Sequence, residues 1–182
     1  MTSLSEHTLH AARRGEPAAL ADVYRWLSPA VLGYFVSRRV DDPEGLTSEV
    51  FLALLPKLPA LTGGVGGLRT LAFSIAHARM VDDARSRARR PLQLAYDADS
   101  DTRIVPSAET HALENHEQEQ VLQLLAVLPP DQAEVLRLRV LADLSLAQTA
   151  AVLGRSEGAV KQLQRRALLA LKEALAGKGV TR

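Results

Sequence analysis

The feature that most constrains the fold is a run of small and apolar residues near the C-terminus, within "SLAQTAAVLGRSEGAVKQLQRRALLAL". Ser145 and Gln148 form a capping-box pattern, which predicts that a helix begins there. Ala150 is followed four residues later by Gly154, and Gly154 six residues later by Val160. Two helices that cross steeply need a small residue at their closest approach, a glycine in the turn and apolar residues that point back. The spacing therefore predicts a helix-turn-helix.

The second helix of this pair combines an inward stripe with a polar face. Ser156 can cap it, and Glu157 lies at its positive end. The inward stripe comprises Val160, Leu163, Ala167 and Leu171. In a major groove, Lys and Arg can hold phosphates or guanine, and Gln can pair with adenine. The outward residues are Lys161, Gln162, Gln164 and Arg165. We favour DNA reading, with an ordinary helical hairpin that has a basic solvated face as the alternative.

The rest of the chain is predicted to be helical, because apolar residues recur at three- and four-residue steps. A helix is expected from near Pro17, broken or bent at Pro29. Asp42 can cap the next helix. The glycine-rich "LTGGVGG" is expected to be a loop, and a long helix with a basic end follows it and stops at Pro91.

Residues 92–106 lose this periodicity and hold Asp97, Asp99 and Asp101, which is typical of an acidic flexible linker. We therefore expect an all-α protein with two helical domains, residues 16–91 and 107–177. The linker would join them, and the helix-turn-helix would lie in the second.

Several classes of function are disfavoured by composition. The net charge is only +1, so a case for nucleic acid must rest on local charge. The chain has no cysteine, which excludes disulfides, thiolate catalysis and cysteine zinc sites, and fits a reducing cytoplasm. No signal peptide or bilayer-length apolar run is present, so we expect a cytoplasmic protein without membrane contact. We expect no catalytic residue, metal or cofactor, because no convincing ligand or nucleophile pattern involves the histidines: His7, His10, His77, His111 and His116.

Three segments of the chain resemble segments of the extracytoplasmic-function (ECF) sigma factors, which are small two-domain members of the bacterial sigma family. "LPPDQAEVLRLRVLADLSLAQTAAVLGRSEGAVKQLQRRALLALKEAL" is similar to the family's C-terminal domain. "LTSEVFLALL" looks like the helix that docks on RNA polymerase, and "IAHARMVDDARSRARRP" is similar to the helix that engages promoter DNA. The resemblance covers both domains in order, from about Leu20 to Leu175.

The resemblance implies a dissociable subunit of bacterial RNA polymerase without catalytic activity of its own. It would bind core polymerase through the β′ clamp and the β flap, recognise the −35 and −10 promoter elements and help to melt DNA. An anti-sigma factor would be a further partner. Residues 16–91 would form the region 2 domain and residues 107–177 the region 4 domain.

The resemblance also assigns residues to each contact. The core-polymerase set is Leu46, Thr47, Glu49, Val50 and Leu54. The −10 set, in which the glycine loop would hold a flipped base, is Thr62, Gly63, Gly64, Arg69, Arg79, Arg85, Arg87, Arg89 and Arg90. The −35 set is Arg139, Arg155, Ser156, Lys161, Gln162, Gln164 and Arg165.

Two rival functions use the same helices. A free-standing helix-turn-helix regulator would bind DNA unaided, as a symmetric dimer. A sigma-mimic adaptor would keep the fold but bind an anti-sigma protein instead of DNA. The adaptor ranks lower, because it would have little use for the arginine-rich end of the long helix.

Overall fold

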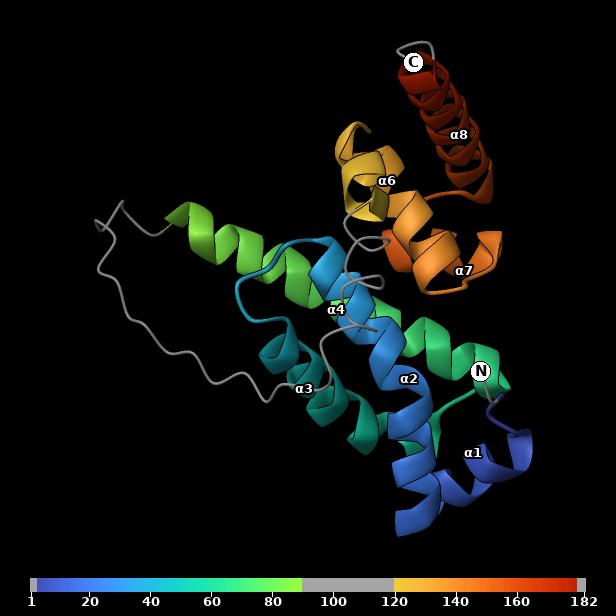
Figure 1. Ribbon diagram of the computed structural model, residues 1–182. Helices are drawn as coiled ribbons and strands as arrows, with labels where there is room; N and C mark the ends of the chain where they lie inside the picture. The colour runs from blue at the N-terminus through green and yellow to red at the C-terminus, as the bar shows by residue number, and fades with distance from the viewer. Residues whose placement is uncertain (1–2, 90–119, 180–182) are drawn as a thin grey trace.

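The computed structural model describes residues 3–89 and 120–179, and within them every regular element is helical and none is a strand (Figure 1). The expected all-α fold is confirmed for these ranges. The expected acidic linker, residues 92–106, lies outside the described residues. None of the described helices is both long and apolar enough to cross a bilayer.

The N-terminal half packs its helices around one apolar core. Tyr34, Phe35 and Phe73 are fully buried there, and the rings of Tyr34 and Phe73 meet edge to face with centroids 5.8 Å apart. Aromatic pairs favour this geometry because the ring edge is positive and the ring face negative. The elements are α1 (Glu6–Arg13), α2 (Pro17–Ser37), α3 (Pro43–Leu54), η1 (Leu55–Ala60) and α4 (Gly64–Arg89).

Two features of this half differ from expectation. We expected the helical pattern to begin near Pro17, but α1 precedes it, capped by the Ser5 hydroxyl and burying Leu9. Of the break or bend expected at Pro29, the break does not occur, because α2 runs through this residue. A proline removes only one backbone donor, and the buried side chains of Leu27 and Val31 on either side keep the helix packed.

The glycine-rich segment is a loop only in its first part, because α4 already begins at Gly64. The Glu6 carboxylate accepts a hydrogen bond from the Val65 backbone N–H at 2.9 Å. It thereby satisfies one of the donors that a helix leaves open at its N-terminus. A Cβ on Gly67 would overlap the carbonyl oxygen of Thr62, so the close turn into α4 requires glycine there.

The C-terminal half contains the predicted helix-turn-helix. Its elements are the helical residues 120–126, α6 (Pro130–Leu136), the π-helical turn η2 (Arg137–Leu141), α7 (Leu146–Leu153) and α8 (Glu157–Gly179). Ser145 and Gln148 form the full capping box, and Gly154 has φ 61°, the left-handed conformation that the turn needs. Ser156 accepts a hydrogen bond from Ala159 N at 3.2 Å, as expected for a cap of α8.

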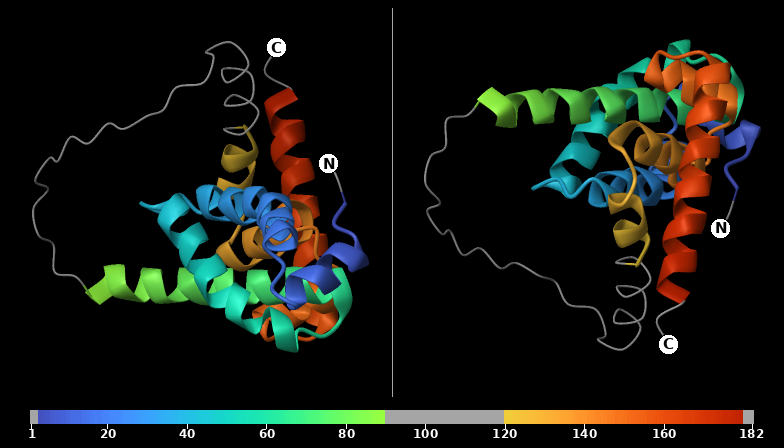
Figure 2. Two further views of the ribbon diagram at one scale, coloured as in Figure 1. Left: turned by 90° about the horizontal axis from the view of Figure 1, so that it is seen from below. Right: turned by 90° about the horizontal axis from the view of Figure 1, so that it is seen from above.

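The two halves share part of their apolar core. Val135, Ala150 and Val160 form a small cluster of their own, which confirms the predicted approach of the two helices. In contrast, Leu138 and Leu144 belong to the same buried cluster as the core of α1–α4. α7 lies against the N-terminal part of α4, and η2 lies against α2 (Figure 2).

Candidate nucleic-acid and polymerase interface

The exposed face of α8 carries the predicted base- and phosphate-reading side chains. Lys161, Gln162 and Arg165 are exposed, whereas Gln164 is half-buried. The Arg139 guanidinium donates to the Gln164 side-chain oxygen at 3.2 Å and to the Leu144 carbonyl. Arg139 and Gln164 therefore hold α8 against the preceding helices in this structure. The exposed polar face of α8 is narrower than expected, because Gln164 is not free on it.

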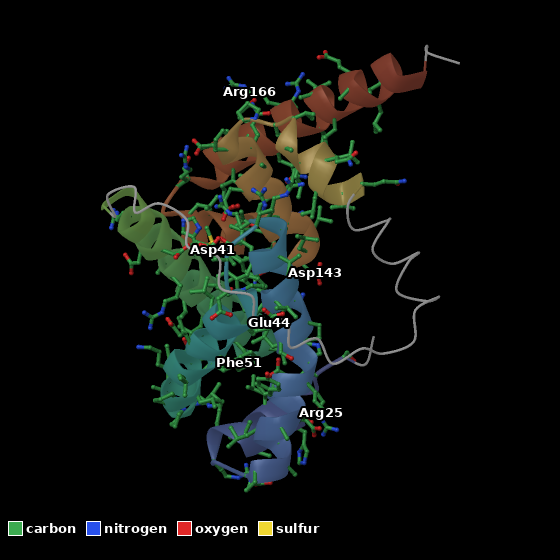
Figure 3. All side chains as sticks on the ribbon, turned by 60° about the vertical axis from the view of Figure 1, so that its left-hand side comes forward. Arg25, Asp41, Glu44, Phe51, Asp143 and Arg166 are labelled. Carbon is green, nitrogen blue, oxygen red and sulfur yellow. The ribbon has the colours of Figure 1, made fainter. Side chains whose placement is uncertain are left out.

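The turn before α8 is also tied down by side chains. Arg155 pairs with Asp131 of α6 at 2.6 Å, and its side chain is 43% exposed. The Ser156 hydroxyl is engaged at the start of α8. Arg166 is also exposed, and Figure 3 shows it on α8, far from α3.

The exposed face of α3 differs from the one that the resemblance implied. Thr47, Val50 and Leu54 are buried in the core of the N-terminal half. Thr47 also donates to the Pro43 carbonyl at 2.7 Å. These three side chains could contact a partner protein only if α3 separated from α2 and α4. Their role in this structure is to pack α3 against the core of the N-terminal half.

A different set of α3 residues reaches the surface. Glu49 is exposed, and Leu52 is 73% exposed, the highest fraction among the large hydrophobic side chains that the structure describes. Figure 3 shows Glu44 and Phe51 on α3; Glu44 is exposed, while Phe51 is buried with its ring 4.5 Å from that of Tyr24. Leu52 lies off the buried stripe, and that offset is the sequence signal that identifies it.

A groove of about 500 Å³ opens beside the glycine loop. Thr62 of the predicted −10 set lines it, whereas Lys57, Thr70 and Ser74 were not predicted. Thr70 and Ser74 are four residues apart on α4, so their hydroxyls share one helix face. The remaining lining residues are Ala60, Leu61, Gly67 and Leu71.

The arginines of the predicted −10 set whose side chains the structure describes are Arg69, Arg79 and Arg85, and each has different partners. Arg85 is exposed, 3.8 Å from Asp82 one helical turn away. Arg79 is 3.4 Å from Glu49 of α3, so a predicted DNA residue and a predicted polymerase residue contact each other. The side chains of Arg87 and Arg89 and all of Arg90 lie outside the described residues.

Among the three arginines of the predicted −10 set whose side chains are described, Arg69 is the most enclosed, with a side chain only 17% exposed. Its guanidinium stacks on the Trp26 ring, 4.6 Å from the ring centroid. It also donates to the Ala142 carbonyl at 3.2 Å and to the Asp143 carboxylate at 2.9 Å. In this arrangement, Arg69 is occupied by the C-terminal half.

Comparison with known proteins decides between the rival functions. The family model described as Sigma-70, region 4 matches residues 124–173. ShbA of Streptomyces griseus, an ECF RNA polymerase sigma factor, is 32% identical over 176 residues, which cover 90% of this chain and 91% of that protein. This chain belongs to the ECF RNA polymerase sigma factors.

Other comparisons agree with this membership in the sigma family. SigD of Mycobacterium tuberculosis, also an ECF sigma factor, is 29% identical over 171 residues, covering 91% of this chain and 81% of that protein. The fold matches CnrH, solved in complex with the cytosolic domain of CnrY, with a TM-score of 0.66 and 20% identity over 96% of this chain and 99% of that one.

A buried ionic cluster joins the two halves of this sigma factor. The Glu134 carboxylate of α6 accepts a hydrogen bond from the Tyr34 hydroxyl at 2.6 Å and lies 3.1 Å from His77 Nδ1. Arg38 forms an ion pair with it, and Arg137 lies 3.7 Å away. His77 of α4 is half-buried where this helix meets α6.

One carboxylate faces two arginines and a histidine in this cluster, so Glu134 is stabilised in its charged form. Burial raises the pKa of Glu134, but the hydrogen bond with His77, the charge of Arg38 and the Tyr34 hydroxyl outweigh it, so the pKa lies below the ordinary 4.5. Burial also raises the pKa of Tyr34, so its phenol keeps its proton and donates to Glu134. Sequence reasoning missed Glu134, although a carboxylate flanked by the apolar residues Ala133, Val135 and Leu136 signals a buried partner.

Proposed function

We propose that this sigma factor binds core RNA polymerase, recognises the −35 and −10 promoter elements and helps to melt DNA between them. The observation that carries the proposal is the polar face of α8: Lys161, Gln162 and Arg165 are exposed on a helix that the Gly154 turn holds across α7. The role is one of recognition, with no chemical step assigned to the protein itself.

The −35 element is assigned to the N-terminal half of α8. Lys161 and Arg165 are four residues apart and therefore share one face of the helix. Gln162 lies beside them and offers the amide that can pair with adenine. Arg139 and Gln164 are reassigned as residues that position the helix pair, because they bond to each other.

The −10 element is assigned to the groove beside the glycine loop and to the basic face of α4. Extruding a base from a duplex costs a few kcal/mol, so a pocket must hold the base. Lys57, Thr62, Thr70 and Ser74 supply hydrogen-bonding groups in a groove large enough for one. Arg85 and the arginines after it would hold the adjoining phosphates.

The contact with the β′ clamp is assigned to the outer face of α3, with Leu52 as the apolar centre and Glu49 and Ser48 beside it. The β flap is assigned to the region 4 domain. We also take from the family resemblance an anti-sigma partner, a cytoplasmic location and the two domains, residues 16–91 and 107–177.

The test is a pull-down of the purified protein with bacterial core polymerase, followed by transcription from a genomic fragment library. We expect stable binding and new start sites that share two sequence elements. Leu52→Glu should lower core binding by at least about tenfold, because it places a charge at the centre of an apolar contact. The matched control is Ala21→Glu, which places the same charge at an exposed apolar position of α2, outside the contacts proposed here. Absence of core binding by the unmodified protein, or equal binding by both variants, would contradict the proposed contact.

A further inference from the structure

We propose that the free protein is held closed by a latch in which Glu134 of the C-terminal half occupies a carboxylate-binding site of the N-terminal half. The site consists of Tyr34, Arg38 and His77, and we call it, together with Glu134, the Glu134 latch. In the closed state, the C-terminal half covers residues proposed to contact −10 DNA, a consequence that rests on the proposed function.

The Glu134 latch is a contact between the halves, not within one. Tyr34 and Arg38 come from α2 and its C-terminal cap, and His77 comes from α4. Glu134 is 5% exposed and comes from α6. A buried carboxylate is tolerated only when cations and donors surround it. Tyr34, Arg38 and His77 surround Glu134 only when the two halves are packed together. The cluster therefore favours the closed state over states in which the halves are partly separated.

An apolar seam accompanies the latch. Leu138, Ala142 and Leu144 have no exposed surface and pack into the cluster that α1–α4 form. Val152 of α7 joins the same cluster with 9% exposure. Separation of the halves would bring these side chains into water, which the hydrophobic effect disfavours. A partner that opens the protein must therefore cover this seam or bind the open state much more tightly.

A second contact places the C-terminal half over the proposed −10 surface. Asp143 puts a carboxylate on Arg69, which is where a DNA phosphate would be held. Gln148 of α7 donates to the Gly66 carbonyl at 2.9 Å, beside the groove of the glycine loop. Asp143 has φ 49°, and its backbone turn directs η2 into α7. The closed state thus competes with DNA for Arg69.

The test measures the distance between the halves in the full chain. The protein has no cysteine, so two can be introduced uniquely, at the exposed positions Ala21 of α2 and Lys172 of α8, and labelled for energy transfer. We expect efficient transfer in the parent. Glu134→Gln should raise the ratio of open to closed molecules by at least about tenfold, because the charge that Arg38 and His77 surround is lost.

The matched control is Asp131→Asn. Asp131 is a carboxylate on the same helix, but it is exposed and pairs with Arg155 of its own half, so its loss should leave the transfer unchanged. A second variant, Asp143→Asn, acts at the surface, and asparagine accepts a positive φ. It should raise the open fraction about two- to fivefold, as expected for an exposed ion pair.

The outcomes separate the latch from the proposed function. Equal transfer in the parent and in both variants, with helicity retained by circular dichroism, overturns the latch. If Glu134→Gln loses helicity, Asp143→Asn decides by the same criterion. An open shift without tighter binding to core polymerase supports the latch but contradicts its proposed role in transcription. An open shift with tighter binding supports both.

Discussion

At the scale of single residues, Glu134 links the pH response of the protein to its closed state. Its carboxyl has a pKa below 4.5 in the folded protein and an ordinary value when unfolded. A lowered folded-state pKa contributes stability that is fully present above the unfolded value and is lost as pH falls through the folded one.

The first prediction follows from this sign. Lowering the pH below about 4.5 should reduce the free energy of unfolding more steeply in the parent than in Glu134→Gln, which has no carboxyl to protonate at this position. Urea unfolding by circular dichroism between pH 7 and acid would measure the difference, with Asp131→Asn as control. Parallel pH profiles for the parent and Glu134→Gln would contradict it.

The second prediction compares two glycines. A Cβ on Gly67 would overlap the Thr62 carbonyl, whereas nothing lies within 4 Å of a Cβ on Gly33 inside α2. Gly67→Ala should cost about 2 kcal/mol, as overpacking does, and Gly33→Ala should add about 0.5–1 kcal/mol, because alanine favours the helix. Chemical denaturation measures both. A stabilised Gly67→Ala would show that the turn into α4 does not need glycine.

At the scale of elements, α8 separates packing from recognition along one helix. Its buried positions, Val160 and Ala167, hold it against α6 and α7, while its exposed cations lie on the other side. Substitution of an exposed cation should therefore change DNA binding with little effect on the stability of the fold.

The third prediction uses two cations of this helix. Arg165→Ala should lower the slope of log affinity against log salt for −35 duplex DNA by about 0.9, the value for one phosphate contact. Lys172→Ala, exposed farther along α8, should leave the slope unchanged. Binding titrations of the polymerase complex at several salt concentrations give both slopes. Equal slopes for the two variants would remove Arg165 from the interface.

At the scale of the whole molecule, the two halves unfold together if they share a core. Trp26 is the only tryptophan and lies in α2, so its fluorescence reports the N-terminal half and its stacking with Arg69. Circular dichroism reports the helices of both halves.

The fourth prediction is that these two signals give coincident thermal transitions in the parent, as one cooperative unit requires. In Glu134→Gln, the dichroism should begin to fall at a lower temperature than the fluorescence changes, because the C-terminal clusters are small. Coincident transitions in both proteins would mean that the apolar seam alone couples the halves.

Local sequence determined the helices and their ends. The Ser145 capping box, the Gly154 turn and the inward stripe of α8 were predicted because each depends on residues within one or two turns of the helix. The whole of residues 61–67 was expected to be a loop, but α4 already begins at Gly64. This error arose because the group that stabilises the start of α4 is not local. The Glu6 carboxylate that caps the start of α4 lies 59 residues away in the sequence.

Tertiary structure alone decided which side chains are exposed for binding a partner and which are buried or paired within the protein. The helical period of the sequence identifies which stripe of α3 is apolar. It does not decide whether that stripe packs in the core or binds a partner protein. The structure places Val50 in the core. Tyr34 and Glu134 are separated by 100 residues, and no local pattern pairs them. The contacts of Arg69 and His77 likewise depend on how the two halves pack. Short-range periodicity sets the elements, whereas burial of charge and apolar surface between them is settled only when the whole chain is folded.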